Sequence, residues 1–299
     1  MAQSTSFFGL RRGSTKSLTF SVYNGKQVTK DRVTNVKNPR SVAQKNQRAI
    51  MATALHGYSA LKEICDHSFE GIAYGQKSMN YFVSKNAGII RNAAAGVNLS
   101  FYKGNSVSNA YMISKGSLPP VIVTSSASNS TLNFTMNIAA TASESTTFGQ
   151  FMSWFGATKL EDMVTIVALV DNPGGNASLY WIRFRLTQDN QNKSIGFSSQ
   201  AHNILETLEL DDDYETNIDN FSPGDLPVTV KTSSVVFGDG TDENNPKSQS
   251  LGIIVSRKSD TGWLRSPSTM VNLSNTFNYH DALASYPESG EKILNGGSK

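Results

Sequence analysis

The chain changes character after residue 110, where short segments rich in β-branched and aromatic residues follow one another. The predicted strands are PVIVTSS, TLNFTMNI, MVTIVALVD, SLYWIRFRLT, LPVTVKTSSVVF and SLGIIVSRK. Gly, Pro, Asn and Asp separate them, as in DNPGGN (171–176), and a short helix is predicted at FGQFMSWFG (148–156). Because strands and helices do not alternate, the pattern disfavours a parallel doubly wound sheet. It predicts antiparallel strands that close into a β-sandwich.

The N-terminal part of the chain predicts a β-hairpin. LTFSVY (18–23) and KQVTK (26–30) flank the dipeptide Asn24-Gly25, which suits the two left-handed positions of a type I′ turn. Side chains alternate along a strand, so the apolar residues of the first strand share one face and the lysines of the second share the other. One face can pack while the other presents positive charge.

A helical region follows the break at Asn38-Pro39. Ser41 is the predicted cap of a helix that runs to about Asp66. A second, weaker helix is predicted over roughly 76–86. The predicted apolar stripe of the first helix has spacings of three and four residues, and its members are Met51, Leu55, Tyr58, Leu61, Ile64 and Cys65.

These segments together predict an α+β fold. It consists of a basic N-terminal hairpin arm and a short helical region joined to a mainly antiparallel β-sandwich. The predicted boundaries are 1–37 for the arm with its hairpin, 38–95 for the helical region, 96–285 for the sandwich-like domain and 286–299 for a C-terminal tail.

Positive charge is concentrated at the N-terminal end. Residues 1–50 contain ten Lys or Arg and one acid, whereas the other residues contain 17 basic and 23 acidic side chains. The chain is therefore better described as a basic arm on an acidic body than by its net charge of +3. The candidate contact residues for another subunit or for nucleic acid are Lys26, Lys30, Arg32, Lys37, Arg40, Lys45 and Arg48.

Three interpretations of this basic arm remain open. Its cations neutralise nucleic-acid phosphates, or they contact the acidic body of another copy in a ring, or they are simply solvated. Against the first, residues 24–48 lack the interleaved aromatic residues of single-strand binders, and no RNP, KH or helix-turn-helix signature is present. Lys45 and Arg48 in the first turns of the predicted helix oppose the helix dipole, so they either face a partner or are tolerated at a small cost.

The sequence contains no strong motif for catalysis, metal binding or phosphate binding. Cys65 falls on the apolar stripe, the four histidines form no metal-binding pair, and no phosphate-binding loop occurs. The acidic runs 208–215 and 238–245 lack EF-hand spacing, and solvated loops explain them better than calcium sites do. We therefore expect a protein that is not an enzyme and has no cofactor, no metal and no small-molecule substrate. Trp263 is the tryptophan expected to be exposed, although packing is its favoured role.

Neither a secretion signal nor a membrane segment is expected. The first twenty residues lack a continuous apolar core, and the longest apolar run (163–170) is far short of the ~20 residues that a membrane helix needs. With Cys65 as the only cysteine, no intrachain disulfide is expected. We expect a soluble protein without membrane partners.

The segment VYNGKQVTKDRV…NPRSVAQKNQR, with YFVSKNA (81–87) further on, carries a resemblance to a known family. The matching residues are Asn24, Gly25, Lys26, Gln27, Asn38, Pro39, Ser41, Gln44 and Arg48. They resemble the N-terminal signature of an uncharacterised domain family that is widespread in Bacteroidota genomes and in phages infecting them, including crAss-like phages. The β-rich remainder is similar in layout only. The resemblance implies a structural virion protein, made in the bacterial host cytoplasm and located in the virion.

The functional prediction combines this resemblance with the charge pattern. We expect a structural subunit of a tailed-phage virion, in the form of a tail or neck ring component near the portal. Its expected partners are copies of itself and neighbouring portal or tail proteins, through the basic arm. The alternative is a nucleic-acid-binding protein of a phage or mobile element that uses the same arm on DNA. A carbohydrate-binding module that exposes Trp263 is a third, weaker option.

Overall fold

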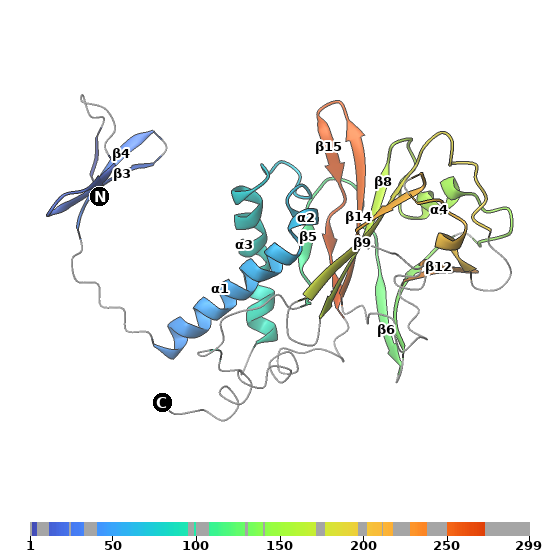
Figure 1. Cartoon of the computed structure of the whole chain (residues 1–299), viewed down its shortest axis with the longest axis horizontal. Helices are drawn as coiled ribbons and strands as arrows, with labels where there is room; N and C mark the ends of the chain where they lie inside the picture. Colours follow the sequence, from blue (N-terminus) through green and yellow to red (C-terminus); the bar gives the residue numbers. More distant parts are fainter. Residues whose placement is uncertain are drawn as a thin grey trace. The chain divides into compact units, whose positions relative to one another are not determined.

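The computed structural model divides the chain into two compact units, Met1–Ser41 and Val42–Lys299, and each is described by itself (Figure 1). The residues that it describes are 2–4, 12–23, 25–32, 41–94, 99, 108–128, 131–139, 141–171, 177–196, 202–210, 212–217, 228–237 and 250–272. The predicted C-terminal tail, 286–299, lies outside these residues. The architecture of the described part is the predicted α+β class, with antiparallel sheets and a separate hairpin-based arm.

The first unit is a four-stranded antiparallel sheet with the order β1-β4-β3-β2. Its strands are β1 (Ala2–Ser4), β2 (Gly13–Ser14), β3 (Leu18–Tyr23) and β4 (Lys26–Asp31). The predicted hairpin is confirmed: Tyr23 pairs with Lys26, and Gly25 has a φ of 74°. A residue without Cβ adopts this left-handed backbone at no steric cost, which explains the glycine at this position.

The strand register places the apolar residues of β3 and the lysines of β4 on opposite faces of the hairpin, as predicted, and the lysine face also carries the buried Val28. Residues directly opposite each other share a face, so Lys26 and Lys30 lie with Tyr23 and Thr19. The opposite face carries the apolar side chains of β3, which are only half-buried: Leu18, Phe20 and Val22. In the described part of this unit, the apolar face of the hairpin is thus incompletely covered.

Three helices open the second unit. They are α1 (Val42–Ala60), α2 (Lys62–Cys65) and α3 (Gln76–Ala93). The amide of Leu61 bonds to the carbonyl of Gly57 and the amide of Cys65 to that of Leu61, so α1 and α2 are nearly continuous. The predicted helix from Ser41 to about Asp66 is confirmed. The second helix continues beyond its predicted end, through Gly88.

The predicted apolar stripe of α1 is wrong at two of its positions. Met51 and Leu55 are 38% and 39% exposed, whereas small residues form much of the buried face of α1. These residues include Ala49, Thr53, Ala54 and Gly57. The reason is close packing: a Cβ on Gly57 would lie 3.2 Å from the hydroxyl oxygen of Tyr111. Small side chains let the helix approach its neighbours, so side-chain size overrides hydrophobicity in selecting the buried face.

A large antiparallel sheet forms the centre of the second unit, with the order β11-β9-β8-β14-β15 and with β17 paired to β14. Its strands are β8 (Met163–Asp171), β9 (Ala177–Arg185), β11 (Tyr214–Thr216), β14 (Ser250–Ser259), β15 (Gly262–Arg265) and β17 (Val271–Asn272). A two-stranded pair, β5 (Met112–Ser114) and β16 (Ser268–Thr269), accompanies it.

The second layer of the sandwich is a smaller antiparallel sheet with the order β10-β12-β13-β7-β6. Its strands are β6 (Thr124–Ser128), β7 (Thr131–Asn137), β10 (His202–Asn203), β12 (Val228–Lys231) and β13 (Ser234–Phe237). The helix α4 (Phe148–Trp154) and the 3-10 turn η1 (Ile204–Glu206) belong to the same layer. The predicted short helix is α4, and Thr147 and Gln150 form a capping box at its start.

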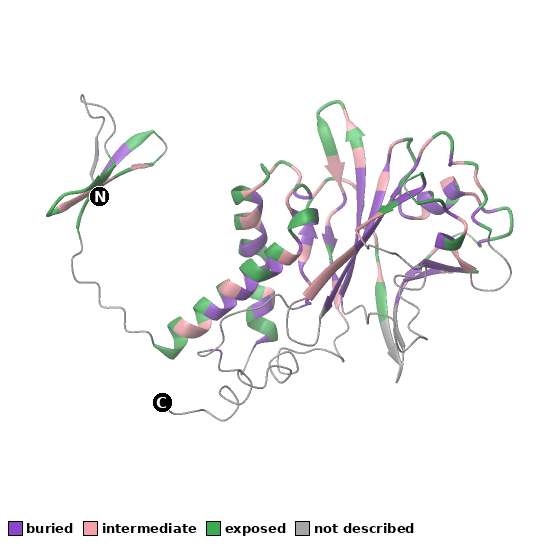
Figure 2. Ribbon diagram, viewed as in Figure 1, coloured by how far each residue is buried: buried purple, intermediate pink, exposed green. Residues whose placement is uncertain are grey.

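The large sheet separates two hydrophobic cores. Ile166 and Ala168 of β8 face the core between the two sheets, whereas Val167 and Leu169 face the core beneath α1, α2 and α3. Figures 1 and 2 show the helices on one side of β8 and β14 and the smaller sheet on the other, with buried residues along both strands. Burial on both faces explains why the segment MVTIVALV is almost continuously apolar and does not alternate.

Candidate functional site

The described part of the first unit is strongly cationic. It contains one carboxylate, Asp31, and the basic residues Arg12, Lys16, Lys26, Lys30 and Arg32. Lys26 and Lys30 are exposed, and within the described residues neither makes an ion pair or a side-chain hydrogen bond. The Arg32 side chain donates a hydrogen bond to the carbonyl of Thr15 at 3.2 Å, so it also braces the sheet. The hairpin therefore presents two free lysines on one face.

The predicted contact residues fall into three groups. Lys26, Lys30 and Arg32 belong to the first unit, and two others lie near the start of α1 in the second unit. Those two are Lys45, which is half-buried, and Arg48, which is exposed. The remaining two, Lys37 and Arg40, lie outside the described residues.

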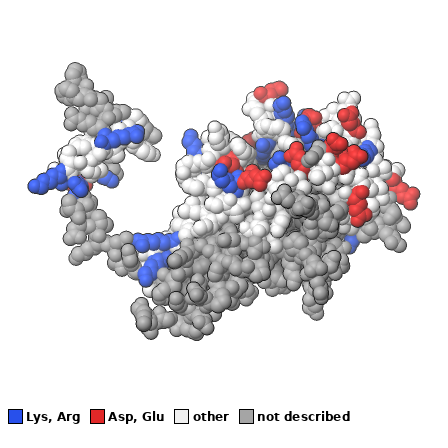
Figure 3. Space-filling model, in the orientation of Figure 1, with Lys and Arg blue, Asp and Glu red and all other residues white. Residues whose placement is uncertain are grey.

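The opposite charge gathers around η1 and β11 in the second unit. We call this surface the acidic edge, and its exposed carboxylates are Glu206, Glu209, Asp212 and Glu215. Figure 3 shows carboxylates concentrated over the sheets of the second unit, with some Lys and Arg among them. β11 is an outer strand of the large sheet, and Glu215 at its centre is exposed and accessible to a partner.

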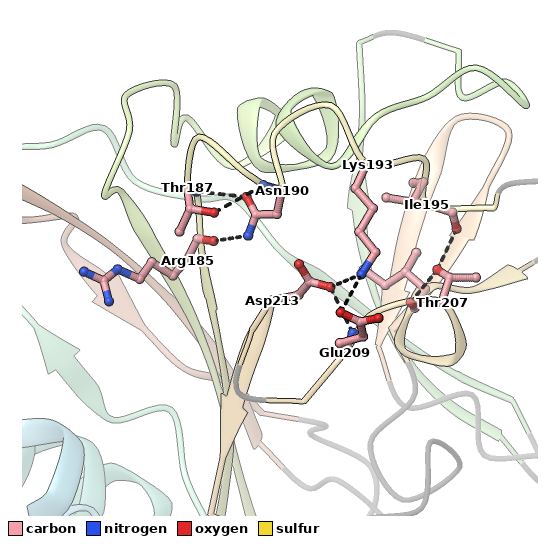
Figure 4. Close-up of polar contacts among 9 residues, drawn as sticks. Arg185, Thr187, Asn190, Lys193, Ile195, Thr207, Glu209 and Asp213 are labelled. Carbon is pink, nitrogen blue, oxygen red and sulfur yellow. Dashed lines mark hydrogen bonds and ion pairs between the residues drawn. The ribbon is translucent and has the colours of Figure 1, made fainter.

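One lysine holds the acidic edge together (Figure 4). Lys193 Nζ lies 2.7 Å from Asp213 Oδ2 and 3.5 Å from Glu209 Oε2. Asp213 is buried, and its Oδ2 also accepts the amide of Glu209 at 2.9 Å. The hydrogen bond that Lys193 donates to Asp213 raises the pKa of Lys193, since it stabilises the charged amine. The predicted acidic run at 208–215 is thus neutralised at its centre by an amine.

The loop that carries Lys193 is fixed by local hydrogen bonds, also drawn in Figure 4. The amide of Thr187 donates to Asn190 Oδ1 at 2.8 Å, and Asn190 Nδ2 donates to the carbonyl of Arg185 at 2.9 Å. The Thr207 hydroxyl donates to the carbonyl of Ile195 at 3.0 Å. These bonds hold the turn before Lys193 and tie the end of the loop to η1.

Metal binding and thiol chemistry find no support in the described residues. Among them, no group of three or more His, Cys, Asp and Glu side chains is arranged to hold a metal ion. The loop 238–245 lies outside them. Cys65 is fully buried with its Sγ 3.7 Å from the carbonyl of Ile113, and burial raises the pKa of its thiol. His67 is exposed and packs against Tyr74, with ring centroids 5.7 Å apart. The cysteine is thus a packed apolar residue, as expected.

The tryptophans occupy the expected environments. Trp181 is buried in the core beneath the helices, and Trp263 is 41% exposed. An arginine lies over each ring: Arg183 is 4.8 Å from the Trp181 centroid, and Arg265 is 5.2 Å from the Trp263 centroid. Trp263 therefore supports a cation with one face of its ring.

These two arginines line a pocket that sequence reasoning missed. We call it the arginine pocket; its volume is about 240 Å³, and it lies between α2 with the following loop and the large sheet. Its lining residues are Glu63, Ile64, His67, Ser68, Met163, Thr165, Arg183, Ile254, Ser256 and Arg265. One feature of the sequence pointed to the pocket: Arg183 lies two residues after Trp181, so the two side chains share the face of β9 that packs toward the helices. Nothing in the sequence linked it to Arg265.

The chain matches no protein-family model, no curated protein and no solved structure. Among the described residues, no helix combines the length and the apolar character needed to span a bilayer.

Proposed function

We propose that the protein is a structural subunit of a tailed-phage virion, a tail or neck ring component near the portal. In this proposal the cationic face of the arm on one copy contacts the acidic edge of the next copy. Such head-to-tail contacts close into a ring when a whole number of copies completes one full turn without a shift along the axis. The virion context comes from the resemblance of the N-terminal segment to a family found in crAss-like phages.

The observation that carries the proposal is the charge arrangement of the arm. Lys26 and Lys30 lie on one face of a separate compact unit, and within the described residues no carboxylate pairs with them. Unpaired cations on a preformed hairpin are available to a partner without loss of an internal ion pair. The half-buried face of Leu18, Phe20 and Val22 gives the same unit apolar area to bury on assembly.

A charge-reversal experiment tests the subunit contact. Lys26→Glu with Lys30→Glu removes the free cations and leaves Arg32, which braces the sheet. We expect this variant to lose the oligomer that the wild type forms, as measured by sedimentation velocity and native mass spectrometry. The matched control is Arg12→Glu with Lys16→Glu, which makes the same charge change in the same unit away from the predicted contacts.

The complementary change identifies the partner surface. Glu206→Lys with Asp212→Lys reverses two exposed carboxylates of the acidic edge. Each reversed variant alone should remain monomeric, and an equimolar mixture of the arm and edge variants should restore oligomers in which the two alternate, because every arm then meets an edge of opposite charge. A wild type that stays monomeric, or an arm variant that keeps its oligomeric mass, would rule out assembly through the arm.

The second candidate function is nucleic-acid binding by the same arm. It is favoured by Tyr23, which is 69% exposed and lies on the lysine face directly opposite Lys26. An exposed ring beside free lysines can stack on a base while the amines contact phosphates. Binding to labelled single- and double-stranded DNA should then weaken steeply between low and moderate salt. Absence of binding at low salt would exclude this function and leave the assembly proposal standing.

A further inference from the structure

We propose that the arginine pocket binds a small molecule through an oxyanion, either a phosphate or a carboxylate, held between Arg183 and Arg265. The site does not involve the basic arm, and it adjoins the acidic edge through the contact between Arg183 and Glu215. Binding alone is proposed, with no reaction at the site.

Strand register brings the two arginines to the same pocket. Arg183 on β9 pairs with Thr165 on β8, and Ser256 on β14 pairs with both Met163 on β8 and Arg265 on β15. Directly opposed residues share a face, and Met163 and Thr165 are two residues apart, so both rungs point to the same side of the sheet. That side faces the helices, and here the loop after α2 leaves a space in place of an apolar contact.

Both guanidinium groups are held in place before any ligand binds. Each stacks on a tryptophan of its own strand, Arg183 on Trp181 and Arg265 on Trp263. Arg183 Nε also donates to the Thr165 hydroxyl at 3.3 Å. Stacking and hydrogen bonding restrict the rotamers of an arginine side chain. Less side-chain conformational entropy is therefore lost when its guanidinium group binds an oxyanion.

The residues that line the pocket include two guanidinium groups and one carboxylate, Glu63. Burial, and then the charge of Arg183, lower the pKa of the Arg265 guanidinium. Three carboxylates act nearby: Glu63 lines the rim, Glu70 accepts the backbone amide of Arg265, and Glu215 contacts Arg183 at 3.4 Å. Glu63 and Glu215 are exposed. In the described residues, the guanidinium of Arg265 donates only to the carbonyl of its neighbour Leu264.

Hydroxyl groups add uncharged donors to the same wall. Ser256 is 6% exposed, and its hydroxyl makes no hydrogen bond to any described residue. This hydroxyl lies at the pocket wall and can donate a hydrogen bond to a ligand oxygen. Thr165 is also buried and accepts from Arg183, so its own proton is available to a ligand. Two guanidinium groups with two hydroxyls form a donor set that suits phosphate or carboxylate oxygens.

The first test is calorimetric titration of the full-length protein with inorganic phosphate and, separately, with succinate, at constant ionic strength set with chloride. Binding of phosphate alone assigns the phosphate class, and binding of succinate alone assigns the carboxylate class. Either result supports the site. Absence of heat and of any thermal shift with both anions at millimolar concentration overturns it.

The second test locates the binding. Arg265→Met should weaken the bound anion roughly tenfold or more, because a charge-assisted hydrogen-bond pair is lost. Arg265→Lys keeps the charge, is milder to the fold and should also weaken binding, since the planar fork is lost. Ser256→Ala should weaken it by a smaller factor. The matched control is Lys258→Met, an exposed cation on β14 outside the pocket wall. Unchanged affinity in Arg265→Lys and Ser256→Ala would place the anion elsewhere and refute the proposal.

Discussion

Arg257 on β14 and Asp162 just before β8 form a buried, two-pronged ion pair between residues 95 positions apart in sequence. Arg257 Nη2 lies 2.6 Å from Asp162 Oδ2, and Nε lies 2.9 Å from Oδ1. The same carboxylate accepts the amides of Thr158 and Lys159 at 2.9 Å each. The pair therefore joins the turn after α4 to two central strands of the large sheet.

Breaking this pair should strongly destabilise the fold. Arg257→Met leaves the carboxylate of Asp162, which is 1% exposed, without its counter-charge. We expect the free energy of unfolding to fall by about 3–5 kcal/mol in urea titrations followed by circular dichroism. Lys258→Met, which removes an exposed neighbouring cation, should change it by less than about 0.5 kcal/mol. Equal losses of stability in the two variants would show that the ion pair between Arg257 and Asp162 does not stabilise the fold.

Replacement by alanine should have opposite effects on stability at Gly116 and at Gly88. A Cβ on Gly116 would lie 1.9 Å from the carbonyl oxygen of Arg265, so Gly116→Ala requires movement of a backbone segment. Gly88 lies within α3 with open space where its Cβ would be. We expect Gly116→Ala to destabilise by about 2–3 kcal/mol and Gly88→Ala to stabilise by about 0.5–1 kcal/mol. Thermal unfolding of both variants checks the sign, and a stable Gly116→Ala would contradict the close approach.

The Tyr58–Asp66 hydrogen bond should shape stability at both ends of the pH range. Tyr58 Oη donates to Asp66 Oδ1 at 2.6 Å. This bond lowers the pKa of Asp66, and burial followed by the same bond raises the pKa of Tyr58 to about 12. The Asp66 contribution is therefore present above the carboxyl's unfolded pKa of about 3.9 and is lost as pH falls through its lowered folded value. The Tyr58 contribution is present below pH ~10 and is lost as pH rises toward 12.

The variant Tyr58→Phe isolates these contributions. It removes both pKa shifts that depend on the hydroxyl, while Asp66 keeps its hydrogen bond from the amide of Gly75. The free energy of unfolding, measured from pH 2 to 11, should depend less on pH at both limits in the variant than in the wild type. Parallel curves for the two proteins would mean that the hydrogen bond contributes nothing to linkage.

Much of the fold follows from local pattern. The dipeptide Asn24-Gly25 predicted the hairpin, and Gly25 has the left-handed φ that such a turn requires. The apolar run 163–170 identified a strand, and its lack of alternation already reflected burial on both sides. The helix that follows Ser41 could also be predicted from the sequence, since the start and the extent of a helix depend on local residues. Its buried face could not be predicted, because it depends on close packing against Tyr111, which lies far along the chain.

Among the charged residues, too, local arrangements could be predicted from the sequence, whereas contacts between distant segments could not. Lys26 and Lys30 were assigned to one face of the hairpin from their spacing alone, and the register agrees. The arginine pocket depends on which strand pairs with which: Arg183 and Arg265 meet only because β8 and β14 lie between β9 and β15. A single sequence contains no direct record of that strand order. Likewise, the acidic run gave no sign that Lys193 would reach Asp213 across an intervening loop.

The position of β8 between two hydrophobic cores couples parts of the molecule that otherwise share little. Its alternate side chains belong to the helical side and to the sandwich side, so the loss of either layer exposes apolar surface of the strand that remains. Neither layer can unfold alone without that penalty, and a force applied to the helices is transmitted to the smaller sheet through β8 and its neighbours β9 and β14. The large sheet thus gives the second unit the mechanical character of a single cooperative block.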